Sequence, residues 1–171
     1  MNLQENIVYR EEQSMRKSPA WVILILVILI SLGLLIVLGI MNKITTQELC
    51  LVLLCILPIH ALVLYLFYIT RFQIRVHYNG IFYRWKPFHR KERFIAKETI
   101  RKFNIRNMPP LQYGVRWLPF MGWFHNVNSK KGIHFKLKNG NNVIIGVKNI
   151  KAFAAAVEQI TSRSETKMKR L

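Results

Sequence analysis

The chain has 171 residues, of which 51% are hydrophobic, and its 26 basic and eight acidic side chains give a formal net charge of +18. All eight acids are Glu and only four follow residue 69, so no pair of carboxylates stands out for acid–base catalysis or for binding Mg²⁺. The two cysteines, Cys50 and Cys55, stand about 140° apart around a helix. This spacing excludes a disulfide between them and a paired metal site.

The first 19 residues form a polar lead before the first apolar run. Within this lead, residues 8–13 fit three descriptions: a short helix, a peptide that docks on the later domain, or part of a flexible tail. The local sequence leaves these alternatives open. We therefore expect only that residues 1–19 form an N-terminal segment outside the membrane.

Two long apolar runs follow, at residues 20–41 and 49–69, joined by the short polar link 42–48. Neither run contains Lys, Arg, Asp or Glu. Each is about long enough to cross ~30 Å of hydrocarbon at 1.5 Å per residue. The sequence therefore predicts a transmembrane helical hairpin over residues 20–69.

The basic residues around the hairpin predict its orientation. Arg16 and Lys17 precede the first run and Arg71 follows the second, whereas the link contains only Lys43. Lys and Arg accumulate on the cytoplasmic side of membranes. We therefore expect an integral cell-membrane protein with both termini, and the segment 1–19, in the cytoplasm.

Polar side chains are rare within the two runs. His60 is the ionisable group at depth, and ionisable groups inside membranes are candidates for function. Counted from the cytoplasmic boundaries, Ser31 and His60 lie at depths that differ by about 3 Å at the helical rise per residue. We expect a neutral His60 to face the first helix and to hydrogen-bond near Ser31, or to a carbonyl freed by Pro58.

After residue 69 the hydrophobic period changes to two, which is typical of strands. Asn79-Gly80 and Asn139-Gly140 predict hairpin turns, and residues 97–100 resemble a helical turn. The predicted short strands are 72–78, 81–86, 94–96, 101–106, 114–117, 122–127, 133–137 and 143–147.

The end of the chain changes to helical spacing. Asn149 is a good N-cap, and the apolar residues that follow recur with the period of an amphipathic helix: Ile150, Phe153, Val157 and Ile160. The order of elements predicts an α+β domain over residues 70–161, either a small antiparallel β-barrel or a bent sandwich, capped by the C-terminal α-helix. Residues 162–171 are predicted to form a basic, disordered tail.

Several short motifs carry a resemblance to a known fold. They lie at residues 79–84, 86–89, 113–116, 126–127, 131–140 and 144–146. In this order they resemble the pleckstrin-homology (PH) superfold, and most closely the bacterial membrane-anchored PH-like proteins, in which two helices precede the barrel. The resemblance covers residues 10–160. It implies a PH-like barrel on a bacterial inner membrane and a scaffolding or binding role, and it brings no catalytic residues and no cofactor.

Positive charge is concentrated after the hairpin, where 22 of the 26 basic residues lie. Cations beside an anionic leaflet are attracted to it, either generically or through recognition of a lipid head group. Nucleic acid also fits the charge, but no nucleic-acid-binding motif supports it. The candidate lipid contacts are Arg71, Lys86, Arg90, Lys91, Arg93, Lys130 and Lys131.

Residues 108–124 are rich in aromatic side chains, the candidates being Tyr113, Trp117, Phe120, Trp123 and Phe124. These rings either fill the barrel core or its mouth, or contact head groups or a partner. The histidines after residue 69 are scattered without the spacing of a metal site.

We therefore expect a non-enzymatic membrane protein without cofactor or metal. Its cytoplasmic domain would bind a protein partner or a second copy of itself. The alternative function is recognition of anionic phospholipid head groups.

Overall fold

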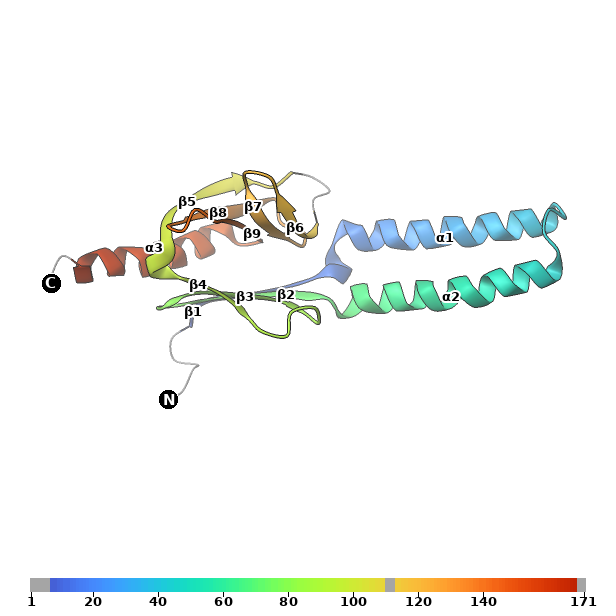
Figure 1. The fold of residues 1–171 in the computed structure, drawn as a ribbon, viewed down its shortest axis with the longest axis horizontal. Helices are drawn as coiled ribbons and strands as arrows, with labels where there is room; N and C mark the ends of the chain where they lie inside the picture. Colours follow the sequence, from blue (N-terminus) through green and yellow to red (C-terminus); the bar gives the residue numbers. More distant parts are fainter. Residues whose placement is uncertain (1–6, 110–112, 169–171) are drawn as a thin grey trace.

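The computed structural model describes residues 7–109 and 113–168. The molecule is elongated, with two long helices at one end and a β-rich domain at the other (Figure 1). The helices are α1 (Pro19–Ile40) and α2 (Thr46–Ile69). Thr45 and Glu48 form a reciprocal capping box, which fixes the start of α2 directly after the short link. Two apolar helices followed by a β-rich region and a closing helix are confirmed.

Both helices are long and apolar enough to cross a membrane. In α1 the buried residue is Ile28, and α2 has no buried residue. Neither helix is therefore a buried core helix within this chain. Their apolar side chains require an apolar surrounding that the described part of this chain does not supply.

The domain consists of two sheets that face one another. The four-stranded sheet has the order β1-β2-β3-β4 and is antiparallel. Its strands are β1 (Ile7–Ser14), β2 (Arg71–His77), β3 (Gly80–Lys86) and β4 (Arg93–Ala96).

The five-stranded sheet has the order β5-β8-β9-β7-β6 and contains one parallel pair, β7 with β9. Its strands are β5 (Ile100–Asn107), β6 (Gly114–Leu118), β7 (Gly122–Asn126), β8 (Lys131–Leu137) and β9 (Asn142–Val147).

The prediction of an antiparallel barrel is wrong in two respects. The two sheets share no strand, so the described residues form no closed barrel, and the second sheet is mixed rather than antiparallel. The physical reason lies at the crossing between the sheets. The chain passes from β4 to β5 through the 3-10 turn η2 (Lys97–Thr99). A closed barrel would need β4 and β5 to be hydrogen-bonded to each other, whereas they form the edges of two separate sheets.

Strand β1 belongs to the domain although it precedes the hairpin in the chain. It pairs antiparallel with β2, with Ser14 opposite Arg71. Of the three descriptions of residues 8–13, docking on the later domain is therefore the one that the structure shows, and the docked segment is a strand. The helical hairpin is thus an insertion between two neighbouring strands.

The connections between the hairpin and the domain are very short. A 3-10 turn, η1 (Met15–Lys17), joins β1 to α1, and Thr70 alone separates α2 from β2. The Met15 N–H donates to the Thr70 carbonyl at 3.1 Å, which ties the two connections together. Figure 1 shows β1 and β2 leading directly to α1 and α2.

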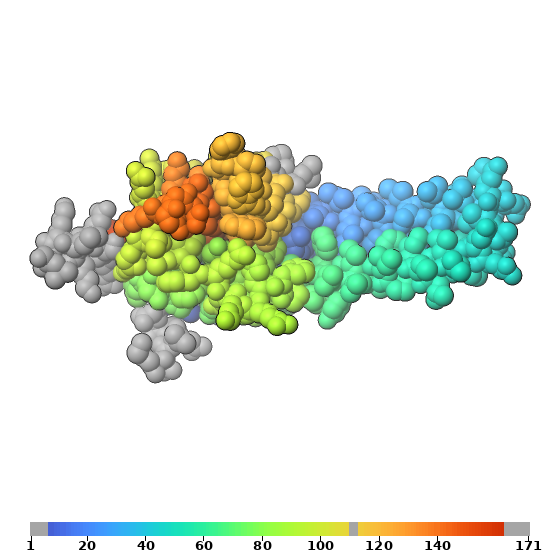
Figure 2. Space-filling view, in the orientation of Figure 1, coloured from blue at the N-terminus to red at the C-terminus, as the bar shows by residue number. Residues whose placement is uncertain are grey.

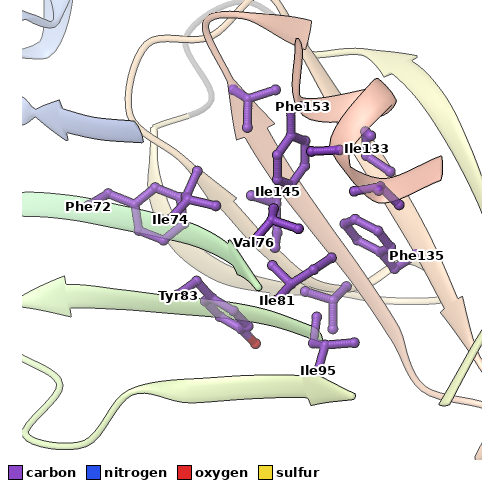
Figure 3. Close-up of a cluster of buried hydrophobic side chains, with 14 of the residues drawn as sticks. Phe72, Ile74, Val76, Ile81, Tyr83, Ile95, Ile133, Phe135, Ile145 and Phe153 are labelled. Atoms are coloured by element: carbon purple, nitrogen blue, oxygen red, sulfur yellow. The ribbon is translucent and has the colours of Figure 1, made fainter. Parts of the chain in front are cut away.

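The core lies between the sheets and beneath the closing helix α3 (Ile150–Met168). Figure 3 shows side chains from β2, β3, β8, β9 and α3 meeting there, among them Phe72, Tyr83, Phe135 and Phe153. The Ala152 N–H donates to the Asn149 side chain at 3.2 Å, as expected of an N-cap. The helix continues to Met168, through much of the segment predicted to be a disordered tail, and residues 169–171 lie outside the described residues.

The hairpin between β2 and β3 forms at the predicted place but is shifted by one residue. His77 pairs with Gly80, so the two-residue loop is Tyr78-Asn79 and Gly80 begins β3. A Cβ at Gly80 would lie 2.2 Å from the carbonyl oxygen of Ile95. Glycine is therefore needed here for the close approach of β4.

Candidate functional site

The end of the domain nearest the helices gathers several of the predicted basic residues. We call it the helix-proximal end. It contains Arg71, the first residue of β2, and Lys86, which is paired with it across the sheet. The loop that follows Lys86 carries exposed Arg90 and Lys91 beside the exposed ring of Phe88. Figure 1 shows this loop on the side of the domain that faces α2.

Lys130 and Lys131 lie at the same end, on the opposite sheet. They follow Asn128, whose side-chain amide donates to the carbonyl of Lys17 at 3.2 Å, immediately before α1. Six of the seven predicted lipid contacts are therefore brought to the helix-proximal end. Of these, Arg71 is neutralised by an ion pair with Glu12 at 2.9 Å.

Arg93 is placed differently from the other predicted cations. It begins β4 opposite Tyr83, three residues along β3 from Lys86. Its guanidinium lies 5.2 Å from the centre of the Trp123 ring, in a cation–π contact. Arg93 therefore joins β4 to β7 across the two sheets, and is less available to a ligand than Arg90 or Lys91.

An apolar pocket of about 460 Å³ opens at the helix-proximal end, between the last turns of α2 and the two sheets. Helix α2 supplies Val63, Leu66 and Phe67, its C-terminal cap is Thr70, and the turn η1 before α1 supplies Met15. The domain supplies Trp85, Phe88, His89, Gly114 and Val115. Sequence reasoning missed this pocket because its walls come from four segments that are distant in the chain.

The polar groups on the pocket wall are engaged within the protein. The Thr70 hydroxyl donates to the Leu66 carbonyl at 2.6 Å, and the Trp85 indole N–H donates to Nδ1 of His125 at 3.1 Å. The Trp85 backbone N–H lies 3.4 Å from Nδ1 of His89. The wall therefore presents hydrocarbon and ring faces rather than open hydrogen-bonding groups.

His125 supports the floor of this pocket from inside the core. Its ring is fully buried, lies parallel to Phe72 at 5.9 Å and meets Tyr83 edge-on at 4.9 Å. Burial lowers the pKa of His125 to about 3, and the charges of Arg93 and His89 act in the same direction. Because Nδ1 accepts a hydrogen bond, the neutral ring carries its proton on Nε2. This buried, neutral imidazole packs as an aromatic core residue.

A second charged region covers the outer face of the four-stranded sheet. Arg75 is ion-paired with Glu92, and Nε of Arg84 lies 4.0 Å from the same carboxylate. Arg10 and Gln73 border a small polar hollow there. Because acids and bases alternate on this face, it is less suited to an anionic ligand than the loop that carries Arg90 and Lys91.

The structure divides the predicted aromatic residues into two sets. Phe124 is buried in a small cluster with Met108 and Ile144, and Tyr113 is half-buried. Trp117, Phe120 and Trp123 are 61%, 98% and 42% exposed. Phe124 therefore fills the core, which was one of the two alternatives for these rings. Trp117, Phe120 and Trp123 lie at the surface.

The exposed rings lie on the β6–β7 hairpin, which runs away from the helices. Gly114 and Asn126 are paired near the helix-proximal end, and Leu118 and Gly122 are paired at the opposite end of the hairpin, beside its turn. Phe120 lies in that turn. Figure 2 shows the gold-coloured β6–β7 region projecting from the side of the domain. The hairpin tip is therefore turned away from the helices rather than towards them.

Ser31 and His60 meet between the two helices. Nε2 of His60 lies 3.5 Å from the Ser31 hydroxyl, which donates to the Ile28 carbonyl at 2.8 Å. The hydroxyl oxygen can then accept a hydrogen bond from the Nε2–H of His60, while Nδ1 has no hydrogen-bond partner among the described residues. This arrangement joins the two helices at depth, as the sequence predicted.

The described side chains that could take part in acid–base catalysis or metal binding are not clustered. Glu98 and Glu158 are exposed, and Glu92 is engaged with Arg75. Within residues 7–109 and 113–168, no group of three or more His, Cys, Asp or Glu side chains could hold a metal ion. No protein-family model matches the chain, and comparisons with curated proteins and with solved structures found no similar protein.

Proposed function

We propose that this chain is a non-enzymatic integral membrane protein whose β-domain binds anionic lipid at the membrane surface. The observation that carries the proposal is the cluster of exposed cations around Phe88 at the helix-proximal end. An aromatic ring flanked by Lys and Arg is the chemistry that suits a head-group region. Each cation near an anionic leaflet contributes about 1 kcal/mol.

The short connections support this reading. If α1 and α2 cross the bilayer, Thr70 is all that separates the end of α2 from the domain. The helix-proximal end then lies against the head groups, and the loop with Arg90 and Lys91 cannot swing away from them. Since β1 and β2 are neighbours in one sheet, both ends of the hairpin lie on the same side. The basic flanks favour the cytoplasmic side.

The order of elements also supports the proposed kinship with bacterial membrane-anchored PH-like proteins. Two helices, inserted between β1 and β2, precede the other strands of a two-sheet domain that ends in a packed helix. On this proposal the membrane is a bacterial inner membrane, whose anionic cytoplasmic leaflet would meet the basic loop.

The test is selective retention of lipid by the full-length protein. The protein is reconstituted in vesicles of mixed anionic and zwitterionic lipid, purified in mild detergent, and its bound lipid is quantified. We expect anionic lipid to be enriched over its share of the vesicle. The double variant Arg90→Gln/Lys91→Gln should lose most of this enrichment.

A matched control removes the same charge elsewhere. Lys136 and Lys138 are exposed on the opposite side of the domain, at and beyond the end of β8, and Lys136→Gln/Lys138→Gln should retain the enrichment. Equal loss in both double variants would mean that only net charge matters. That result, or no enrichment at all, would contradict the proposal.

A second function is favoured by the exposed hairpin tip. Phe120 is 98% exposed in a turn directed away from the helices, where a protein partner or a second copy of the chain could reach it. Exposed aromatic residues are typical anchors of protein interfaces. The same purification tests this function: a recurrent partner or a dimer should be lost in Phe120→Ser, whereas lipid enrichment should not change.

A further inference from the structure

We propose that the apolar pocket between α2, β3 and β6 accepts one acyl chain of the anionic lipid whose head group lies on Arg90 and Lys91. The inference rests on the proposed function and names its ligand more closely. It assigns a hydrocarbon site to the protein in addition to the charged surface. The lipid comes from the bilayer that surrounds α2.

The side chains that line the pocket favour a hydrocarbon ligand. The hydroxyl of Thr70 and the indole N–H of Trp85 already donate within the protein, so a polar ligand would lose its hydrogen bonds to water without replacement. A chain of methylene groups loses nothing on entry and gains contact with Leu66, Phe67 and Val115. The volume of about 460 Å³ lies within the usual range for ligand pockets.

The position of the pocket selects a membrane lipid rather than a ligand from solution. Val63, Leu66 and Phe67 belong to the last turns of α2, so one wall of the pocket is the surface of the helix that lipid chains would cover. An acyl chain lying along α2 could enter without crossing water. Its hydrophobic contact would be continuous from the bilayer to Trp85.

Charge complementarity selects an anionic head group. Phe88 and His89 form the rim of the pocket, and the next two residues are the exposed Arg90 and Lys91. A lipid whose chain lies in the pocket therefore has its phosphate within reach of both cations. Zwitterionic lipids offer the same chain but a weaker attraction to this pair.

The experiment uses Trp85 as the reporter, since it is 2% exposed and lines the pocket. Trp21, Trp117 and Trp123 are replaced by Phe in the full-length chain, and folding is verified by thermal unfolding. The protein is reconstituted with anionic lipids that carry bromine on the acyl chain, which quenches tryptophan on close approach. We expect Trp85 to be quenched by the brominated anionic lipid and much less by a zwitterionic lipid with the same chain.

Two variants locate the quenching. Val115→Phe fills the pocket from β6 and should remove most of the quenching. Ile105→Phe adds the same ring at an exposed position on β5 and should leave the quenching unchanged. Absence of quenching, quenching that Val115→Phe does not reduce, or equal quenching by zwitterionic lipid would each overturn the proposal.

Failure here is distinguishable from failure of the proposed function. If anionic lipid is retained by Arg90 and Lys91 while Trp85 is not quenched, the head group binds and the chain stays in the bilayer. If Trp85 is quenched equally by both lipids and no anionic lipid is enriched, the proposed function itself fails.

Discussion

His125 shows how one residue links the core to the candidate site. Its imidazole fills the space between Phe72 and Tyr83 and accepts the only side-chain hydrogen bond that Trp85 can donate. A hydrocarbon side chain of similar size would leave the indole N–H buried without a partner, which costs about 1–3 kcal/mol. The histidine therefore holds the indole of Trp85, which lines the apolar pocket, and fills the core with its own ring.

The low pKa of His125 predicts a loss of stability in acid. The pKa is about 3 in the folded protein and about 6.5 in the unfolded chain. Below pH 6.5 the unfolded chain binds the extra proton, so the free energy of unfolding falls by about 1.4 kcal/mol per pH unit until pH 3. Thermal unfolding in detergent at pH 8 and pH 5 should show this loss for the wild type.

The variant His125→Gln separates this effect from other titrations. Gln keeps an acceptor for the Trp85 N–H and cannot be protonated in this range. The difference in melting temperature between pH 8 and pH 5 should become clearly smaller. His77→Gln, at a partly exposed histidine, should keep most of the difference, and an equal effect of the two variants would refute the assignment.

At the scale of elements, β1 is paired with β2 along its length, and one carboxylate also joins it to the segment that begins α3. Glu11 accepts hydrogen bonds from the backbone N–H groups of Lys148 and Asn149, at 3.0 and 3.4 Å, just before α3 begins. It also accepts from the side chains of Tyr9 and Gln13. A single residue therefore connects the N-terminal strand to the start of the closing helix.

We expect Glu11→Ala to lower the free energy of unfolding by about 2–4 kcal/mol, because several donors lose their acceptor at once. Glu12→Ala is the matched control. Glu12 makes an exposed ion pair with Arg71, and its loss should cost less than about 1 kcal/mol. Chemical unfolding followed by tryptophan fluorescence measures both. Similar costs for the two variants would show that Glu11 does not hold β1.

At the scale of the whole molecule, the helices and the strands behave as one extended body. The hairpin enters and leaves through β1 and β2, which are hydrogen-bonded to each other. Arg16 lies over the ring of Tyr68 at 5.3 Å, which adds a contact between the two connections. Figure 2 shows the helices as a rod that leaves one end of the domain.

This architecture predicts the labelling pattern of single cysteines. With Cys50 and Cys55 replaced by Ser, Arg10→Cys and Glu158→Cys should react with an impermeant thiol reagent from the same, cytoplasmic, side of the membrane. Lys43→Cys, in the link, should react from the other side. Labelling of Arg10→Cys and Glu158→Cys from opposite sides would contradict the β1–β2 pairing, and labelling of both from outside would contradict the orientation.

The sequence by itself determined the features that depend on local periodicity. The charge-free runs around Ser31 and His60 predicted the helical hairpin, alternation after residue 69 predicted the strands, and helical spacing after Asn149 predicted the closing helix. These predictions succeed because a helix or strand with a buried face carries apolar residues at regular intervals, and one that is apolar on all faces carries a continuous apolar run.

Only the tertiary structure decided how distant segments meet. β1 was ambiguous because Glu11 and Gln13 point inward, so its buried face is polar and the alternation of apolar residues is lost. The mixed sheet depends on the pairing of β7 with β9, and the pocket beside Trp85 depends on α2 and β6 lining the same space. No local period encodes them, because their stabilising contacts join residues that are far apart in the chain.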